Sequence, residues 1–209
     1  MKKGKILLIS APSGTGKGAV IGELRSRRDD IEYSVSWTTR APREGEINGV
    51  HYFFKTQQEF DENAEKGGFL EYARLYSTSY GTPKDYVEER LNAGKHIILE
   101  IDTQGALNVM ANSKPEDVIS LFILPPSMKE LYRRLAGRGT ETAGKVAERF
   151  AISYKEIPKA NSYKYIIIND TIAQAADRIE DILAGNGEKY FNNDEMKLFI
   201  KALEEETLL

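Results

Sequence analysis

Short, continuous apolar runs alternate with longer amphipathic segments over most of this chain. The apolar runs are rich in Ile, Leu and Val, as is typical of parallel strands that are covered on both faces. They lie at Lys5–Ser10, His96–Ile101, Val118–Leu124 and Tyr165–Ile168. Helices are expected at Lys17–Arg28, Gln104–Ala111, Ser127–Ala136, Ala143–Glu156 and Thr171–Ala184. This alternation predicts an α/β fold, in which a mostly parallel sheet is flanked by helices and ligands bind at the carboxyl ends of the strands.

Residues 31–93 break this alternation. Polar and apolar residues alternate in the stretch EYSVSWTTRAPREGEINGVHYFF, and Asn48-Gly49 is a turn-forming pair, so a small antiparallel element is expected. Two helices should follow, one near Thr56–Lys66 and one that opens at Thr82-Pro83 and ends at Gly94. This pattern is that of an α+β module inserted into the main fold.

Composition and charge exclude several classes of protein. The chain has no cysteine, so it has neither a disulfide framework nor a thiolate metal site. Its net charge of −3 argues against sequence-independent binding to nucleic acid. No apolar run approaches the roughly 18 residues that a membrane helix requires, and the run Ile6–Ile9 is too short for a signal peptide. We therefore expect a cytoplasmic protein with neither nucleic acid nor a membrane as partner.

The tail of the chain, from Asn186 onward, has its own pattern. It contains the amphipathic stretch MKLFIKALEEETLL, which predicts a helix. One face of this helix is expected to pack on the core or on a second subunit, so a homo-oligomer remains open.

The stretch ISAPSGTGKGAV has the context of a phosphate-binding loop, because an apolar strand leads into it and a helix begins at about Lys17. Gly14 and Gly16 allow the backbone N–H groups to face a phosphate, and Lys17 can reach the outer phosphates. Ala11 replaces the usual first glycine and Gly18 the usual hydroxyl residue; a plain glycine-rich turn is the alternative. The expected phosphate-binding residues are Ala11, Pro12, Ser13, Gly14, Thr15, Gly16, Lys17 and Gly18.

Gly18 and Ala19 offer no oxygen to a metal, so any Mg²⁺ should be held mainly by nucleotide phosphates and water. Two acids, Glu100 and Asp102, end the strand in HIILEIDTQG, where a phosphate-bound metal, its waters or a substrate would lie. A solvated strand terminus is the alternative for this pair. No certain metal ligand from the protein is predicted.

The inserted module contains groups that suit a phosphate. Arg40 and Arg43 lie three residues apart across a proline, and arginine grips phosphate oxygens with a planar fork. Tyr52 and Tyr80 can each donate a phenolic hydroxyl to the same phosphate. Taken singly, such an arginine is more often a surface charge and such a tyrosine part of a core.

Several motifs, in order, resemble guanylate kinase, the enzyme family that phosphorylates GMP with ATP. These are APSGTGKG, VSWTTRAPREGEINGVHYFF, FLEYARLYSTSYGTP, LEIDTQG, RRLAGRGTET and IIIND, between about residues 5 and 185. The resemblance implies a P-loop core with a monophosphate-binding insertion and a mobile lid. It also implies conversion of GMP, and of dGMP, to GDP or dGDP with ADP as co-product, in purine nucleotide metabolism with Mg²⁺. The implied segments are core 1–34, GMP-binding insertion 35–93, core 94–126, lid 127–160, and core with C-terminal helix 161–209.

The resemblance also implies residue roles. The GMP site would comprise Ser36, Arg40, Arg43, Tyr52, Glu71, Tyr80, Thr82 and Asp102. Within it, Glu71 would accept from guanine N1–H and the exocyclic amino group, and Ser36 and Thr82 would donate to the oxygen at C6. Arg138 and Arg149 would be lid arginines, with Arg134 contributing. The catalytic set would be Lys17, Arg40, Arg138 and Arg149, and Asn169 would join the ATP base pocket.

Three other functions stay open at this point. A kinase for another nucleoside monophosphate would share the core and lid, but would have no use for the guanine-reading set. A non-catalytic guanylate-kinase-like binding module is the second alternative, although such modules tend to have damaged phosphate loops or lids. A simple ATPase is the third, and it leaves Arg40 and Arg43 unexplained.

Overall fold

The computed structural model describes residues 3–99, 101, 103–137 and 142–206. The chain forms two compact units. The first comprises residues up to Leu8 together with Asp30–Ile119, and the second comprises Ile9–Asp29 with Ser120–Leu209. Two strands, β1 (Ile6–Ser10) and β8 (Val118–Leu124), begin in the first unit and end in the second.

Three strands of the first unit pair in parallel, in the order β2-β7-β1. The strands are β2 (Ile31–Tyr33), β7 (His96–Leu99) and β1, with Ile6 opposite Ile97 and Ile31 opposite His96. All five residues of β1 are buried, as a continuous apolar run in a covered sheet requires. Helices α3 (Lys84–Asn92) and α4 (Thr103–Asn112) and the 3₁₀ turn η1 (Pro115–Asp117) belong to the same unit.

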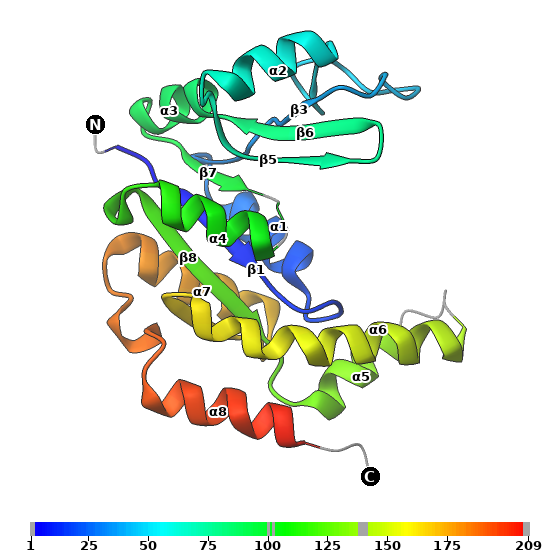
Figure 1. Cartoon of the computed structure of the whole chain (residues 1–209). Coiled ribbons are helices and arrows are strands. Elements are labelled where there is room, and N and C mark those ends of the chain that lie inside the picture. The colour runs from blue at the N-terminus through cyan, green and yellow to red at the C-terminus, as the bar shows by residue number, and fades with distance from the viewer. Residues whose placement is uncertain (1–2, 100, 102, 138–141, 207–209) are drawn as a thin grey trace. The chain divides into compact units, whose positions relative to one another are not determined.

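A second, four-stranded sheet of the first unit has the order β4-β3-β6-β5. Its strands are β3 (Trp37–Thr38), β4 (Phe53–Phe54), β5 (Phe69–Leu75) and β6 (Thr78–Pro83). Helix α2 (Gln57–Glu65) begins at a capping box and contributes Phe60, whose ring stacks on Phe69 at 4.5 Å between centroids. Figure 1 shows α2 beside the long β5–β6 hairpin.

The expectation of an antiparallel element in residues 31–93 was wrong at two pairs of strands, because β2 pairs in parallel with β7 and β3 pairs in parallel with β4. Strands β3 and β6, and β5 and β6, are antiparallel, but β3 and β4 run parallel. The reason is that residues 39–52 form a long loop between β3 and β4 instead of a tight hairpin. Gly49 adopts a φ of 78° in this loop, so Asn48-Gly49 does turn the chain, but inside the loop.

The second unit pairs β8 in parallel with β9 (Tyr165–Ile168), with Leu121 opposite Tyr165. Helix α1 (Lys17–Arg27) packs against α7 (Ile172–Ala184), and α5 (Met128–Ala136) against α6 (Ala143–Glu156). The 3₁₀ turn η2 (Ile157–Ser162) continues α6, and η3 (Glu188–Tyr190) precedes α8 (Asp194–Glu205). The predicted α/β class with a mostly parallel sheet and flanking helices is confirmed.

The amphipathic tail forms α8, as predicted, and α8 packs on η2 within its own chain through an apolar face that buries Ile200 and Leu203. Helix α7 is capped at Thr171 and stops at Gly185, whose φ of 93° suits a residue without a side chain. Among the described residues, no helix is both long and apolar enough to cross a membrane.

Candidate active site

The loop between β1 and α1 has the backbone that phosphate binding requires. Gly14 and Gly16 have φ of 85° and 97°, values that favour glycine. Among the described residues, Tyr76 is the one non-glycine with positive φ, so Ala11 adopts an ordinary backbone conformation and loses nothing by not being glycine. Among the described residues no side chain caps the N-terminus of α1, and the partial positive charge of a helix N-terminus favours an anion.

Neighbouring elements of the second unit hold this loop from several sides. The Ser13 hydroxyl accepts hydrogen bonds from Arg149 Nε and Nη2 at 3.1 and 2.6 Å. The Ser153 hydroxyl, also on α6, donates to the Ser13 carbonyl at 2.9 Å. Asn169 Nδ2 donates to the Thr15 carbonyl at 2.7 Å. Arg149, a predicted lid arginine, is thus brought directly onto the phosphate loop.

Gly14→Ala is expected to reduce stability and ATP affinity, whereas Gly18→Ala is expected to reduce neither. A Cβ on Gly14 would lie 2.6 Å from Leu135 Cδ2 and would force a strained φ, whereas a Cβ on Gly18 would meet no atom within 4 Å. We expect Gly14→Ala to cost about 1–3 kcal/mol of stability and to weaken ATP binding at least about tenfold. Gly18→Ala should bind ATP normally and unfold at the same or a slightly higher temperature. Thermal unfolding and ATP titration of both variants measure this, and equal ATP affinities would contradict the loop geometry.

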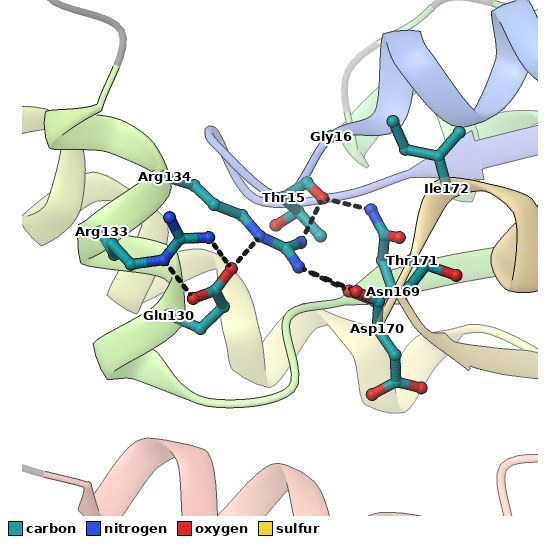
Figure 2. Close-up of a pocket in the computed structure, with 9 residues that line it drawn as sticks. All are labelled: Thr15, Gly16, Glu130, Arg133, Arg134, Asn169, Asp170, Thr171 and Ile172. Carbon is teal, nitrogen blue, oxygen red and sulfur yellow. Dashed lines mark hydrogen bonds and ion pairs between the residues drawn. The ribbon is translucent and has the colours of Figure 1, made fainter.

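A cavity of about 330 Å³ opens beside this loop in the second unit (Figure 2). Its lining comprises Thr15, Gly16, Glu130, Arg133, Arg134, Asn169, Asp170, Thr171 and Ile172. Asn169 is 2% exposed, and its Oδ1 atom is buried without a hydrogen-bond partner. Because Nδ2 is bonded to Thr15, the amide presents its oxygen as a free acceptor.

Arg134 serves as a clamp in this cavity. Its guanidinium donates to the carbonyls of Thr15, Asn169 and Asp170 at 3.3, 3.0 and 3.3 Å. Its Nε donates to Glu130 at 2.8 Å, and Arg133 bonds the same carboxylate (Figure 2). These two guanidinium groups lower the pKa of Glu130 to about 2, so its charge persists at neutral pH. Arg134 therefore ties α5 to the loop and to the end of β9.

The inserted module of the first unit orients Arg40. The Arg40 guanidinium makes a two-pronged ion pair with Glu46, at 2.7 and 2.6 Å, and lies 5.1 Å from the centroid of the Tyr52 ring. Arg40 and the Arg43 backbone N–H lower the pKa of Glu46 to about 2. The hydrogen bonds to Glu46 raise the pKa of Arg40 above its ordinary value, and an interaction with the Tyr80 hydroxyl adds to this rise.

Three of the four side chains predicted to hold a phosphate lie together in the structure. Arg40, Tyr52 and Tyr80 lie together, with the two tyrosine rings 6.1 Å apart between centroids. Arg43 follows on the exposed loop, where its backbone N–H donates to the Glu46 carboxylate at 2.7 Å and its carbonyl accepts from the Glu46 N–H at 3.0 Å. Glu46 therefore links Arg43 to the Arg40 cluster.

Glu71 and Thr82 are brought together as directly opposed residues of the β5–β6 hairpin. The Thr82 hydroxyl donates to Glu71 Oε1 at 2.7 Å, and Thr82 is 1% exposed. A hydroxyl has a single proton, so in this state Thr82 orients Glu71; donation to a guanine oxygen requires the hydroxyl to rotate. Ser36 lies just before β3, and its hydroxyl makes no described bond to either residue.

Two predicted site residues, Asp102 and Arg138, lie outside the described residues. Other site residues were missed by sequence reasoning. Glu46 is the clearest of them, together with Glu130, Arg133, Thr171 and Ile172 of the cavity. The spacing of Glu46, three residues after Arg43, is a weak indication that an acid pairs with these arginines, because acids are common on any exposed loop.

Comparisons with known proteins agree with this geometry. A family model described as guanylate kinase matches residues 3–186. The chain belongs to the guanylate kinase family. A guanylate kinase of Clostridium tetani is 49% identical over 184 residues, which cover 88% of this chain and 87% of the relative. That of Clostridioides difficile is 46% identical, covering 90% and 91%.

A guanylate kinase of Mesoplasma florum is 49% identical over 87% of this chain, but this chain spans only 61% of that protein's length. A crystal structure of guanylate kinase from Anaplasma phagocytophilum shares 33% identity, covers 99% of this chain and superposes with a TM-score of 0.61. The guanylate kinase motifs are divided between the units, since the phosphate loop lies in the second and the Arg40 and Glu71 clusters in the first.

Proposed function

We propose that this chain catalyses transfer of the γ-phosphoryl group of ATP to GMP, and to dGMP, giving ADP and the nucleoside diphosphate. The observation that carries the proposal is the Glu71–Thr82 pair, because it holds a half-buried carboxylate that can accept from both the N1–H and the exocyclic amino group of guanine. The Arg40 cluster supports it as a phosphate anchor in the same unit. The phosphate loop and Lys17 are proposed to bind ATP, the phosphoryl donor.

Guanine recognition follows from donor and acceptor patterns. The Glu71 carboxylate accepts from guanine N1–H and from its exocyclic amino group, and Ser36 and Thr82 are proposed to donate to the oxygen at C6. Adenine has no donor at N1 and carries an amino group at C6, so AMP would leave these polar groups unpaired. Membership of the guanylate kinase family agrees with this choice of base.

Transfer needs positioning and charge neutralisation more than a covalent enzyme intermediate. A phosphate oxygen of GMP forms a bond to the γ-phosphorus of ATP as the bond from that phosphorus to the β–γ bridging oxygen breaks, and ADP leaves. Lys17 and Arg149 are proposed to spread the charge of the transferring group, and Arg40 to hold the acceptor phosphate. Arg138 is proposed as a second lid arginine. Asp102 is proposed to belong to the GMP-binding residues.

Mg²⁺ is proposed to enter with ATP, bound mainly to phosphate oxygens and water. The residues of the loop fit this arrangement. Gly18 and Ala19 have no side-chain oxygen to bind a metal, and the Ser13 hydroxyl already accepts from Arg149. The ion would neutralise developing charge on the phosphates.

The Asn169 cavity is proposed to hold the adenine of ATP and to select it over guanine. Its free Oδ1 can accept from the adenine amino group but would oppose the guanine oxygen. For the wild-type protein we expect kcat/KM for ATP to exceed kcat/KM for GTP by about 10²-fold. Asn169→Ala should lower kcat/KM for ATP about tenfold and so reduce the ratio of kcat/KM for ATP to kcat/KM for GTP. Steady-state kinetics with each donor measures this. Asn161→Ala, which alters an exposed amide in η2, is the control; a ratio unchanged in Asn169→Ala would contradict the assignment.

Product analysis tests the proposed reaction. ATP, Mg²⁺ and GMP are incubated with the protein, and nucleotides are separated by chromatography. Equal amounts of GDP and ADP are expected. Tight GMP binding without GDP formation would favour the binding-module alternative, and ADP without GDP would favour an ATPase.

A further inference from the structure

The family match ends at residue 186, and residues 187–206 continue within the second unit. We call residues 188–206 the C-terminal strap; it comprises η3, α8 and the connections around them. The strap is bonded at two places, the η2 segment that follows the C-terminal end of α6 and the first turn of α5. Figure 1 shows α5 and α6 close to the loop that leads into α1.

The first anchor joins the strap to η2, which directly continues α6. Asn192 Nδ2 donates to the carbonyls of Ala160, Asn161 and Tyr163 at 3.4, 3.1 and 3.2 Å. The Phe191 ring packs on Tyr165 with 5.2 Å between centroids. This anchor secures the end of the helix that carries Arg149 and Ser153.

The second anchor joins the strap to the first turn of α5. The Glu206 carboxylate accepts from the backbone N–H groups of Met128 and Lys129, at 3.0 and 3.1 Å. The Ser127 hydroxyl accepts from the Glu130 N–H. Together they satisfy three of the donors that a helix start leaves unpaired, and the negative carboxylate suits the positive end of the helix dipole.

Helix α5 connects this cap with the phosphate loop and with the Asn169 cavity. Its apolar face meets the loop, since a Cβ on Gly14 would collide with Leu135. Its polar face carries Arg134, which bonds the carbonyls of Thr15 and Asn169. A shift of α5 would therefore move the loop and the acceptor of the base cavity together.

We propose that Glu206 is a positioning residue for the donor nucleotide site, which acts by capping α5 from a segment outside the family match. The proposal rests on the proposed function, because the donor site is that of ATP. In this proposal Glu206 contacts no substrate. It fixes the position of α5 and so of Arg134 and Leu135, the leucine that packs against Gly14.

The test compares Glu206→Ala with wild type in the full chain. We expect Kd for the non-hydrolysable analogue AMP-PNP and KM for ATP to rise about three- to tenfold, as they would if the stabilisation that the cap gives to α5 were lost from the nucleotide-bound state. KM for GMP at saturating ATP should stay unchanged, because Glu71 and Arg40 belong to the other unit. Amide hydrogen exchange should speed up at Met128 and Lys129.

Glu205→Ala is the matched control, because Glu205 is the preceding carboxylate and makes only an exposed contact with Lys201 at 3.7 Å. It should leave all of these values unchanged. Glu206→Gln keeps one acceptor oxygen and should fall between wild type and Glu206→Ala, and it replaces the alanine variant if that one does not fold. Wild-type ATP affinity in Glu206→Ala, or equal rises in KM for ATP and GMP, would overturn the proposal. Binding of AMP-PNP and amide exchange do not depend on turnover. They therefore test the role of Glu206 even if the proposed kinase reaction is not observed.

Discussion

Lys17→Ala is expected to reduce GMP phosphorylation by about 10³-fold while the protein remains folded. Lys17 is the first residue of α1, directly after the positive-φ Gly16, at the helix start that is proposed to face the ATP phosphates. Removal of one positioned charge from a phosphoryl-transfer site typically costs 10²–10³-fold or more in kcat. Turnover measured at saturating ATP and GMP gives the size of the effect.

The control for this change is Lys159→Ala, which removes an exposed lysine from η2 of the same unit. Circular dichroism and thermal unfolding should be the same for Lys17→Ala, Lys159→Ala and wild type. Full activity of folded Lys17→Ala would refute the phosphate-loop assignment, whatever the remaining motifs suggest.

Glu71→Ala is expected to lower kcat/KM for GMP by about 10²–10³-fold and to remove most of the preference for GMP over AMP. The carboxylate is the proposed partner of two guanine donors, and Thr82 holds it in place at 2.7 Å. A site built to pair with such donors rejects bases that lack them because its polar groups are otherwise left unpaired. ATP binding, measured with AMP-PNP, should not change.

Glu65→Ala provides the comparison, since Glu65 is an exposed acid at the end of α2 in the same unit. It should retain wild-type kinetics with both acceptors. An unchanged Kd for GMP in Glu71→Ala would remove Glu71 from the base site, and the choice of GMP would then need another explanation.

The parallel strands and the phosphate loop were predictable because their residues carry local information. A parallel strand that is covered on both faces is apolar at most of its positions, which makes β1, β7, β8 and β9 visible as short runs. The loop glycines are visible because their positive φ excludes most other residues. The roles of Glu71 and Asn169 came from resemblance, since each residue by itself is an ordinary polar side chain.

Contacts distant in sequence were not predictable in this way. The β5–β6 hairpin contains Gly81 and Pro83 and alternates weakly, so its pairing with β3 depends on tertiary packing around Phe60 and Phe69. The clamp made by Arg134 joins elements that are 119 residues apart, and no local spacing encodes such a contact. The cap from Glu206 is of the same kind.

One assay decides between the possible functions most directly: ADP production from ATP and Mg²⁺ with GMP, with AMP, or with no acceptor. We predict ADP formation that requires an acceptor, with kcat/KM for GMP at least about 10³-fold above that for AMP. Equal rates with GMP and AMP would contradict the guanine site of Glu71 and Thr82. ADP formation without any acceptor, or GMP binding with no turnover, would contradict the assignment as a GMP kinase.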